Sequence, residues 1–225
     1  MSYEHDPDYL KTMESYLAGQ WSEAAEGFDK LDRNHPDTAY LKLLRGNVAY
    51  SMGQLGGSVQ HYRDAVQVDP SYGIAWYKLG VCLFRMGRLS EAEEAFSEVL
   101  ARPGQSHAMA RYFIGLISVF LGNDIKAAAA FTQFRAESPE SKIANFYLAQ
   151  LRVRDGQFAE ALELLQDLEA DSPGFGELHY WMGAAHLGAH DTTEAIRSFT
   201  KALDVNPDDE RAKMKLSLLT EVQWP

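Results

Sequence analysis

The feature that most constrains this chain is a period of 34 residues, marked most clearly by five of its prolines. They are Pro36, Pro70, Pro139, Pro173 and Pro207, and the spacings between them are 34, 69, 34 and 34 residues. The long spacing equals two periods plus one residue, which we place near Pro103-Gly104. A fixed period of this length indicates a repeat array in which every repeat is one supersecondary unit.

Small and aromatic residues keep the same period. An alanine stands twelve residues before the closing proline or its equivalent position, at Ala24, Ala92, Ala127, Ala161 and Ala195, and Ser58 replaces it in the second repeat. A bulky side chain stands eight residues before it, at Phe28, Tyr62, Phe96, Phe131, Leu165 and Phe199. Glycine recurs at two further phases, first at Gly46, Gly80, Gly115 and Gly183, and then at Gly19, Gly53, Gly87, Gly122 and Gly156.

The third repeat shows what this pattern means. Its apolar residues recur at helical spacing and do not alternate, which predicts two helices. Gly87 ends the first helix, where a small residue adopts a positive φ cheaply. Gly80 and Ala92 let the two helices approach closely, and Phe96 fills the remaining space. The closing proline cannot continue a helix, so it stops the second one.

The chain resembles the tetratricopeptide repeat (TPR) family, most closely in the segment AWYKLGVCLFRMGRLSEAEEAFSEVL of the third repeat. The resemblance implies an all-α fold: a right-handed α-α superhelix, or solenoid, forming a single domain over residues 1–225. Six helix-turn-helix repeats fit, at 5–38, 39–72, 73–107, 108–141, 142–175 and 176–209, and 210–222 reads as a capping helix. His190 stands where the sixth repeat should have its turn glycine, so that turn departs from the pattern.

In this family the first helix of each repeat lines a concave groove, where ligand segments usually lie. Carrying those positions over predicts an aromatic and apolar groove with a few polar groups. Its residues are Tyr9, Tyr16, Leu43, Asn47, Tyr50, Tyr77, Phe84, Arg85, Tyr112, Leu116, Phe146, Gln150, Arg154 and Tyr180, and Val81 occupies an equivalent position.

Two readings of the groove residues stay open. As a binding surface, the aromatic rings would anchor a partner, Asn47 and Gln150 would pair with a peptide backbone, and Arg85 and Arg154 would hold a carboxylate. Alternatively, the tyrosines only pack between neighbouring repeats. Chaperone-binding members of the family hold a carboxylate with lysines where this chain has tyrosine, leucine and phenylalanine. Of the lysine and asparagine residues that form this carboxylate-binding site in those proteins, only an asparagine is matched here, by Asn47. The sequence therefore argues against the role of a chaperone co-factor.

The charge balance excludes some partners. The 32 acids and 21 bases give a net charge of −11, which disfavours nonspecific binding to nucleic acid or an anionic membrane. The acids gather in the first, fifth and sixth repeats. These acidic ends would either attract a ligand with basic flanks or serve only as the solvated surface of the helices.

No apolar stretch approaches the 20 or so residues that a membrane span needs. We therefore expect no membrane insertion and a cytoplasmic location, or a periplasmic or membrane-associated one if an N-terminal signal has been removed.

Catalytic or metal chemistry finds little support in the sequence. His179, His186 and His190 lie at helical spacings, but packing and capping explain them better than a metal site. Cys82 reads as a small buried apolar residue, and a lone cysteine rules out a disulfide within the chain. The glycines follow the repeat instead of clustering into a phosphate-binding loop. We therefore predict no enzymatic activity, no metal and no cofactor.

Two functions of different class remain. The first is an adaptor that binds a peptide or helical segment of a partner protein in its concave groove. The second is a structural scaffold that self-associates into a homo-oligomer within a larger assembly. Trp224 bears on the second, because it would either fold back on the capping helix or anchor in the groove of a neighbouring copy.

Overall fold

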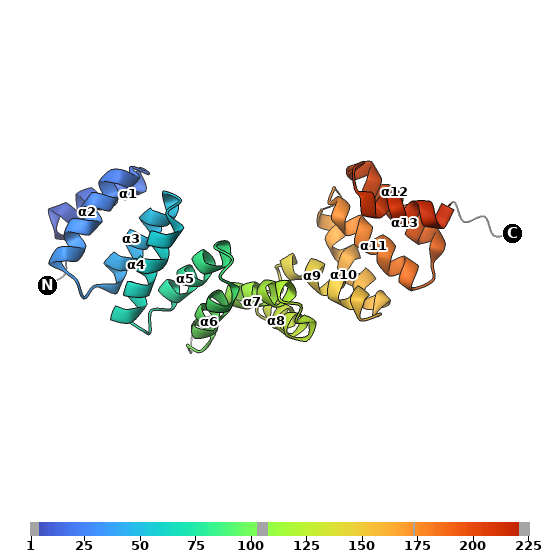
Figure 1. Ribbon diagram of the computed structural model, residues 1–225, viewed down its shortest axis with the longest axis horizontal. Coiled ribbons are helices and arrows are strands. Elements are labelled where there is room, and N and C mark those ends of the chain that lie inside the picture. Colours follow the sequence, from blue (N-terminus) through green and yellow to red (C-terminus); the bar gives the residue numbers. More distant parts are fainter. Residues whose placement is uncertain (1–4, 103–107, 173, 221–225) are drawn as a thin grey trace. The chain divides into compact units, whose positions relative to one another are not determined.

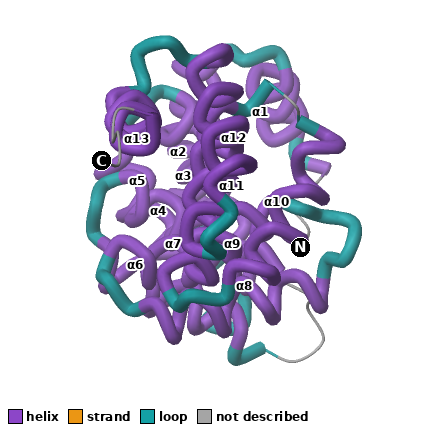
Figure 2. Tube along the Cα trace, turned by 90° about the vertical axis from the view of Figure 1, so that its right-hand side faces the viewer, coloured by secondary structure: helices purple, strands orange, loops and turns teal. Residues whose placement is uncertain are grey.

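The computed structural model describes residues 5–102, 108–172 and 174–220. These residues form thirteen α-helices and no strand (Figures 1 and 2). The all-α solenoid of helix-turn-helix repeats that the sequence predicts is confirmed. The extra residue near Pro103-Gly104, the last two residues expected in the capping helix, and Trp224 lie outside the described residues.

Each predicted repeat contains two helices, and a thirteenth helix follows the sixth repeat. The helices are α1 (Pro7–Leu17), α2 (Trp21–Asn34), α3 (Ala39–Ser51), α4 (Leu55–Val68), α5 (Gly73–Arg85), α6 (Leu89–Leu100), α7 (Ala108–Phe120), α8 (Asp124–Glu137), α9 (Ile143–Arg154), α10 (Phe158–Asp171), α11 (Gly176–Gly188), α12 (Thr192–Val205) and α13 (Glu210–Thr220).

The turns within the repeats need a left-handed backbone residue. The five turn glycines Gly19, Gly53, Gly87, Gly122 and Gly156 have φ between +72° and +75°, as the sequence predicts. In the sixth repeat His190 takes the same conformation, with φ of +63°. The turn therefore forms without glycine, at the steric cost that a side chain meets in this region.

The glycines of the first helices make room for the aromatic ring of the second helix. A methyl group at Gly46 would lie 2.5 Å from Cδ1 of Tyr62, and one at Gly80 would lie 2.8 Å from Cε1 of Phe96. Such distances are far inside van der Waals contact, so only glycine fits without rearrangement. Ser58, which replaces the usual alanine, is buried, and its hydroxyl donates a 2.6 Å hydrogen bond to the Gly46 carbonyl.

The chain divides into two compact units, Met1–Ile117 and Ser118–Pro225, with the division inside α7. The assignment of all 225 residues to one domain stays a prediction. The N-terminal unit has a core around Phe28, Leu31 and Leu44. The C-terminal unit has one core cluster around Leu165 and Leu178 and another around Phe199, against which α13 packs through Ala212.

An arginine fastens the capping helix α13. Arg211 donates a 3.0 Å hydrogen bond to Glu177 of α11 and pairs with Asp209, and its guanidinium lies 4.4 Å from the ring centroid of Tyr180. Hydrogen bonds from Arg211 and from the Ala212 backbone N–H lower the pKa of the Asp209 carboxyl. The predicted helix at 210–222 is thus present through Thr220 and tied to the preceding repeat.

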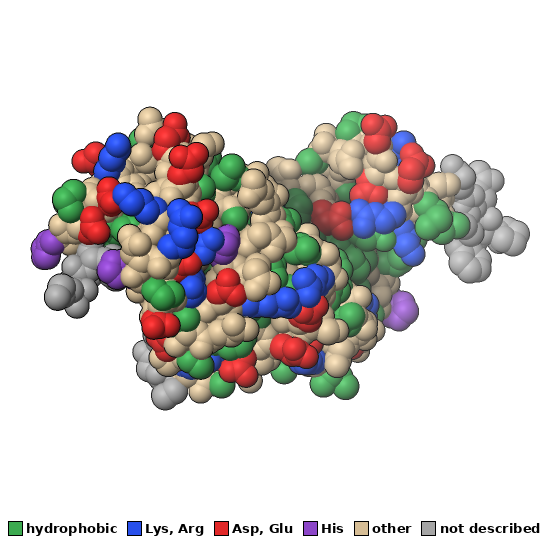
Figure 3. Space-filling view, turned by 60° about the vertical axis from the view of Figure 1, so that its left-hand side comes forward, with side chains coloured by type: hydrophobic (Ala, Val, Ile, Leu, Met, Phe, Trp, Pro, Cys, Tyr) green, Lys and Arg blue, Asp and Glu red, His purple; other side chains and the backbone are tan. Residues whose placement is uncertain are grey.

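Within the described residues, no helix combines the length and the apolar character that crossing a bilayer requires. Acidic and basic side chains lie interspersed on the face drawn in Figure 3. The cytoplasmic location stays a prediction.

Candidate functional site

A cavity of about 310 Å³ opens in the N-terminal unit among helices α1, α3, α4, α5 and α7. Four tyrosines dominate its wall, and we call it the tyrosine pocket. Its lining consists of Tyr16, Asn47, Tyr50, Ser51, Tyr62, Tyr77, Lys78, Val81 and Phe113. The first helices of the repeats supply all but one of these residues, as the repeat pattern predicts for a groove.

Tyr62 is the exception, because it comes from a second helix and reaches the pocket over Gly46. Its hydroxyl donates a 2.8 Å hydrogen bond to Oδ1 of Asn47, and Nδ2 of Asn47 donates a longer one, 3.4 Å, to the hydroxyl of Tyr16. Asn47 is therefore held by two tyrosines of neighbouring helices. Burial raises the pKa of the Tyr62 phenol, so this donor stays protonated at neutral pH.

An aromatic cluster forms the wall beside Tyr77. Phe113 stacks on the buried Phe96 at 4.9 Å between ring centroids and meets Tyr77 and Phe84 edge-on at 6.2 and 5.3 Å. Edge-to-face and offset contacts of this kind add to the stabilisation that burial provides. Burial, followed by the neighbouring Tyr50, raises the pKa of Tyr77.

Two cations of α5 lie at this site. Lys78 lines the pocket itself, and the guanidinium of Arg85 lies 4.8 Å from the ring centroid of Tyr50. Among the residues that the structure describes, no carboxylate lines the pocket. Among the described residues, neither Lys78 nor Arg85 forms an ion pair with an acidic side chain, although the chain carries 32 acids.

The predicted groove residues separate into those that line this pocket and those that do not. Tyr16, Asn47, Tyr50 and Tyr77 line it, with Arg85 and Phe84 in contact with its wall. Of the others in the N-terminal unit, Leu43 and Tyr112 are buried, Leu116 is half-buried, and Tyr9 packs against the first core cluster.

The predicted residues of the C-terminal unit are partly engaged in internal contacts. Phe146 lies 4.9 Å from Phe175 between ring centroids, and Tyr180 packs between Phe199 and Arg211. Arg154 pairs with Asp124 at 3.1 Å, which leaves it a weaker candidate for holding a ligand carboxylate. Gln150 is half-buried.

Sequence reasoning missed Ser51, Tyr62, Lys78 and Phe113 as pocket residues. Ser51, Lys78 and Phe113 directly follow the predicted Tyr50, Tyr77 and Tyr112, so one residue per helical turn was too narrow a selection. For Tyr62 a signal existed, since a hydroxyl-bearing ring stands opposite Gly46 where four other repeats have phenylalanine.

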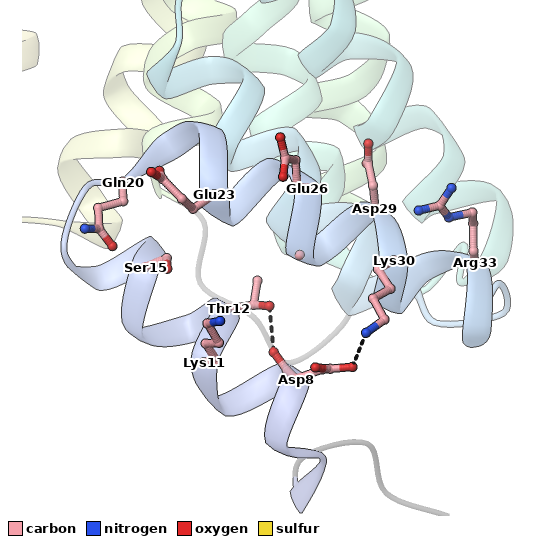
Figure 4. A pocket seen from close by; sticks show the side chains of 11 residues that line it. Asp8, Lys11, Thr12, Ser15, Gln20, Glu23, Glu26, Asp29, Lys30 and Arg33 are labelled. Carbon is pink, nitrogen blue, oxygen red and sulfur yellow. Dashed lines mark hydrogen bonds and ion pairs between the residues drawn. The ribbon is translucent and has the colours of Figure 1, made fainter.

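A second, larger cleft of about 710 Å³ lies between α1 and α2 (Figure 4). Polar and charged side chains line it, and an ion pair between Lys30 and Asp8 closes part of it at 2.5 Å. Four carboxylates and three cations line it without an exposed aromatic anchor. We therefore prefer the tyrosine pocket as the candidate site.

The three histidines do not form a shared centre. His179 is buried with Nδ1 at 3.6 Å from Glu169, while His186 has Nδ1 at 4.0 Å from Asp191. In the part of the chain that the structure describes, no three His, Cys, Asp or Glu side chains are arranged to hold a metal ion. Burial raises the pKa of the Cys82 thiol, which makes it less reactive.

Models of the tetratricopeptide repeat match residues 43–108 and 126–174, 152–219, and 9–38. The chain belongs to the tetratricopeptide repeat family. Proteins of this family are generally protein-interaction scaffolds and are typically non-catalytic. One fold serves many functions, so the site must carry any finer statement.

Two curated relatives are similar to this chain at low identity. The chain is 22% identical over 190 residues to anaphase-promoting complex subunit 3 of Schizosaccharomyces pombe, covering 84% of this chain and 28% of that protein. It is 21% identical over 223 residues to anaphase-promoting complex subunit 7 of Mus musculus, covering 98% of this chain and 39% of that protein. The chain thus spans less than two fifths of either curated relative.

Among solved structures, YrrB, described as a TPR protein with an unusual peptide-binding site, is similar with a TM-score of 0.77. The two are 22% identical, over 85% of this chain and 98% of that one. At this identity the likeness shows the shared fold.

Proposed function

We propose that this chain is a non-catalytic protein-interaction adaptor that binds a segment of a partner protein in the tyrosine pocket of its N-terminal unit. The observation that carries the proposal is the pocket itself, where three half-buried tyrosines from three different repeats, Tyr16, Tyr50 and Tyr77, surround about 310 Å³. Tyrosine gives a large contact area with few rotatable bonds and is enriched among the residues that dominate binding energy.

The contacts that hold the wall of the pocket in place indicate that the site is formed before a ligand binds. Asn47 is fixed by Tyr62 and Tyr16, and the Tyr77 side is backed by the stacked pair Phe96 and Phe113. A pocket that keeps its shape without a ligand loses less conformational entropy on binding. YrrB, which has a similar fold, is described as a TPR protein with an unusual peptide-binding site.

The test compares three forms of the full chain as bait in an extract of the cells that make it. They are the unaltered chain, the double variant Tyr50→Ala/Tyr77→Ala, and Tyr40→Ala as a matched control. Tyr40 is also a half-buried tyrosine of α3, but it packs against the first core cluster outside the pocket. Circular dichroism first establishes that all three are folded.

We expect partners that the unaltered chain and Tyr40→Ala both recover and that the double variant loses. Recovery of the same partners by all three forms would show that the pocket is not the binding surface.

One observation favours a self-associating scaffold as the second candidate. On α13, Met214 and Leu218 lie one turn apart with 56% and 57% of their surface exposed. Residues four apart share a helix face, so this end of the C-terminal unit offers an apolar strip. If a second copy covers it, Met214→Lys/Leu218→Lys converts an oligomer into a monomer in light scattering. A monomeric unaltered chain at micromolar concentration would remove this candidate.

A further inference from the structure

Every polar side chain that lines the tyrosine pocket can donate a hydrogen bond, and Lys78 adds a positive charge that has no acidic partner among the described residues. We infer that the pocket recognises an acidic side chain, aspartate or glutamate, in the partner's segment, with Lys78 as its counter-ion. The inference rests on the proposed function, because it concerns the ligand of the same pocket.

The two hydrogen bonds that join Tyr62, Asn47 and Tyr16, which we call the hydrogen-bond relay, determine which polar groups remain free to bind a ligand. Tyr62 donates to Asn47, and Asn47 donates to the hydroxyl oxygen of Tyr16. The Tyr16 hydroxyl accepts this hydrogen bond and keeps its own hydrogen to donate to a further group. The Asn47 carbonyl oxygen is already engaged by Tyr62, so the relay presents a donor to the cavity. An incoming group that accepts hydrogen bonds suits this end of the pocket.

Charge reinforces the same preference. Lys78 is half-buried and lines the pocket, and an ammonium has three donors and no acceptor. Within the described part of the chain, no carboxylate lines the pocket and none is paired with Lys78. Partial burial weakens the hydration of an ammonium, so a carboxylate brought beside it regains lost interaction. The Tyr77 phenol, which is protonated at neutral pH, is an additional donor.

Arg85 suggests a second acidic position. It follows Lys78 by seven residues on α5, a rise of roughly 10 Å along the helix axis. It stacks on Tyr50, and within the described chain it has no acidic partner. In a polyproline II segment, residues three apart lie on one face about 9 Å apart. A segment with two acids separated by two residues therefore matches the two cations.

The experiment selects binders from a library of random dodecapeptides displayed on phage, using the full chain as target. Enriched sequences are synthesised with a fluorescent label and with either a free or an amidated C-terminus, and the affinities of both forms are measured by anisotropy. The variants are Lys78→Gln, Arg85→Gln, Tyr50→Ala/Tyr77→Ala, and Lys11→Gln as a charge-matched control. Lys11 lies in the polar cleft between α1 and α2.

We expect enriched peptides that carry aspartate or glutamate, many of them with two acids three residues apart. Lys78→Gln should weaken their binding at least tenfold, and salt should weaken binding to the unaltered chain more than to Lys78→Gln. Lys11→Gln should bind normally, and selection on Lys78→Glu should enrich lysine and arginine instead.

Three outcomes would overturn the inference, and they are distinguishable. Peptides that need Tyr50 and Tyr77 but carry no acid, or bind Lys78→Gln equally well, would refute the acidic ligand and leave the proposed function standing. Peptides that lose binding only on amidation would assign the carboxylate to a chain end instead of a side chain. Peptides that bind the double tyrosine variant normally would refute the proposed function too.

Discussion

Replacing Gly46 with alanine should destabilise the N-terminal unit, although alanine is the better helix former. The new methyl carbon would lie 2.5 Å from Cδ1 and 2.9 Å from Cζ of Tyr62. The Tyr62 ring is only 1% exposed and its hydroxyl is bonded to Asn47, so it has little room to turn aside. The strain therefore falls on the packing between α3 and α4 and on the pocket that Tyr62 supports.

Two opposing effects determine how much Gly46→Ala changes the free energy of unfolding. Overpacking a filled core costs about 1–3 kcal/mol, while replacing glycine in a helix interior by alanine gains about 0.8–1.0 kcal/mol. Because several atoms of a buried ring are displaced, we place the cost in the upper part of its range. We expect a net destabilisation of about 1–2 kcal/mol, by combining these ranges. For a chain of this size that lowers the melting temperature by roughly 2–8 °C.

The assay is thermal and urea unfolding followed by circular dichroism, with Gly57→Ala as the matched control. Gly57 lies in the first turn of α4, and a methyl there would meet only Ala49 at 3.9 Å, an ordinary contact. It should leave stability unchanged or raise it by up to about 1 kcal/mol. If Gly46→Ala proves as stable as the unaltered chain, the account of close approach at this position is wrong.

Three further substitutions test other contacts. Tyr62→Phe removes the hydrogen bond to Asn47 and should cost about 1 kcal/mol in urea unfolding; an unchanged midpoint would mean that the relay does not hold Asn47. His190→Gly relieves the positive φ of +63° and should gain up to about 1 kcal/mol, seen as a higher melting temperature, whereas a loss would mean that the His190 side chain makes stabilising contacts. Arg211→Gln removes the pairing with Glu177 and Asp209 and should lower the melting temperature at pH 7. The pKa of Asp209 is lowered in the folded state, so its stabilisation is present above its unfolded pKa of about 4 and is lost as the pH falls through the folded pKa. The effect of Arg211→Gln should therefore shrink below pH 4, and an equal effect at pH 3 would contradict the ion-pair explanation.

The fold was predictable because its determinants are local and repeated. A proline that stops a helix and a glycine at a left-handed turn act within a few residues of themselves, and they recur often enough to reveal the period. His190 is different, because a histidine in place of the turn glycine put that turn in doubt, and the structure shows that it adopts the positive φ all the same. Ser58 departs from the pattern without harm, because its buried hydroxyl finds the Gly46 carbonyl.

The site was less predictable, because it depends on which way each helix is rotated and on which charges find partners. Tyr112 and Phe113 are adjacent, yet Tyr112 is buried and Phe113 lines the pocket. Arg85 and Arg154 hold equivalent positions in their repeats, yet Arg154 pairs with Asp124 while Arg85 lies on Tyr50. Asp124 comes from a different repeat, so the spacing within one repeat carries no information about that contact.

The most direct test of the central claim is site-specific photo-crosslinking from within the pocket. A photoreactive phenylalanine analogue replaces Tyr77 in the full chain, or Tyr40 as the control, and crosslinked peptides from an extract of the cells that make the protein are identified by mass spectrometry. We predict that position 77 crosslinks to one defined segment of a partner protein and that position 40 does not. Equal crosslinking to the same segment from both positions, or none from position 77 while the partner still binds, would contradict the claim that the tyrosine pocket is the binding site.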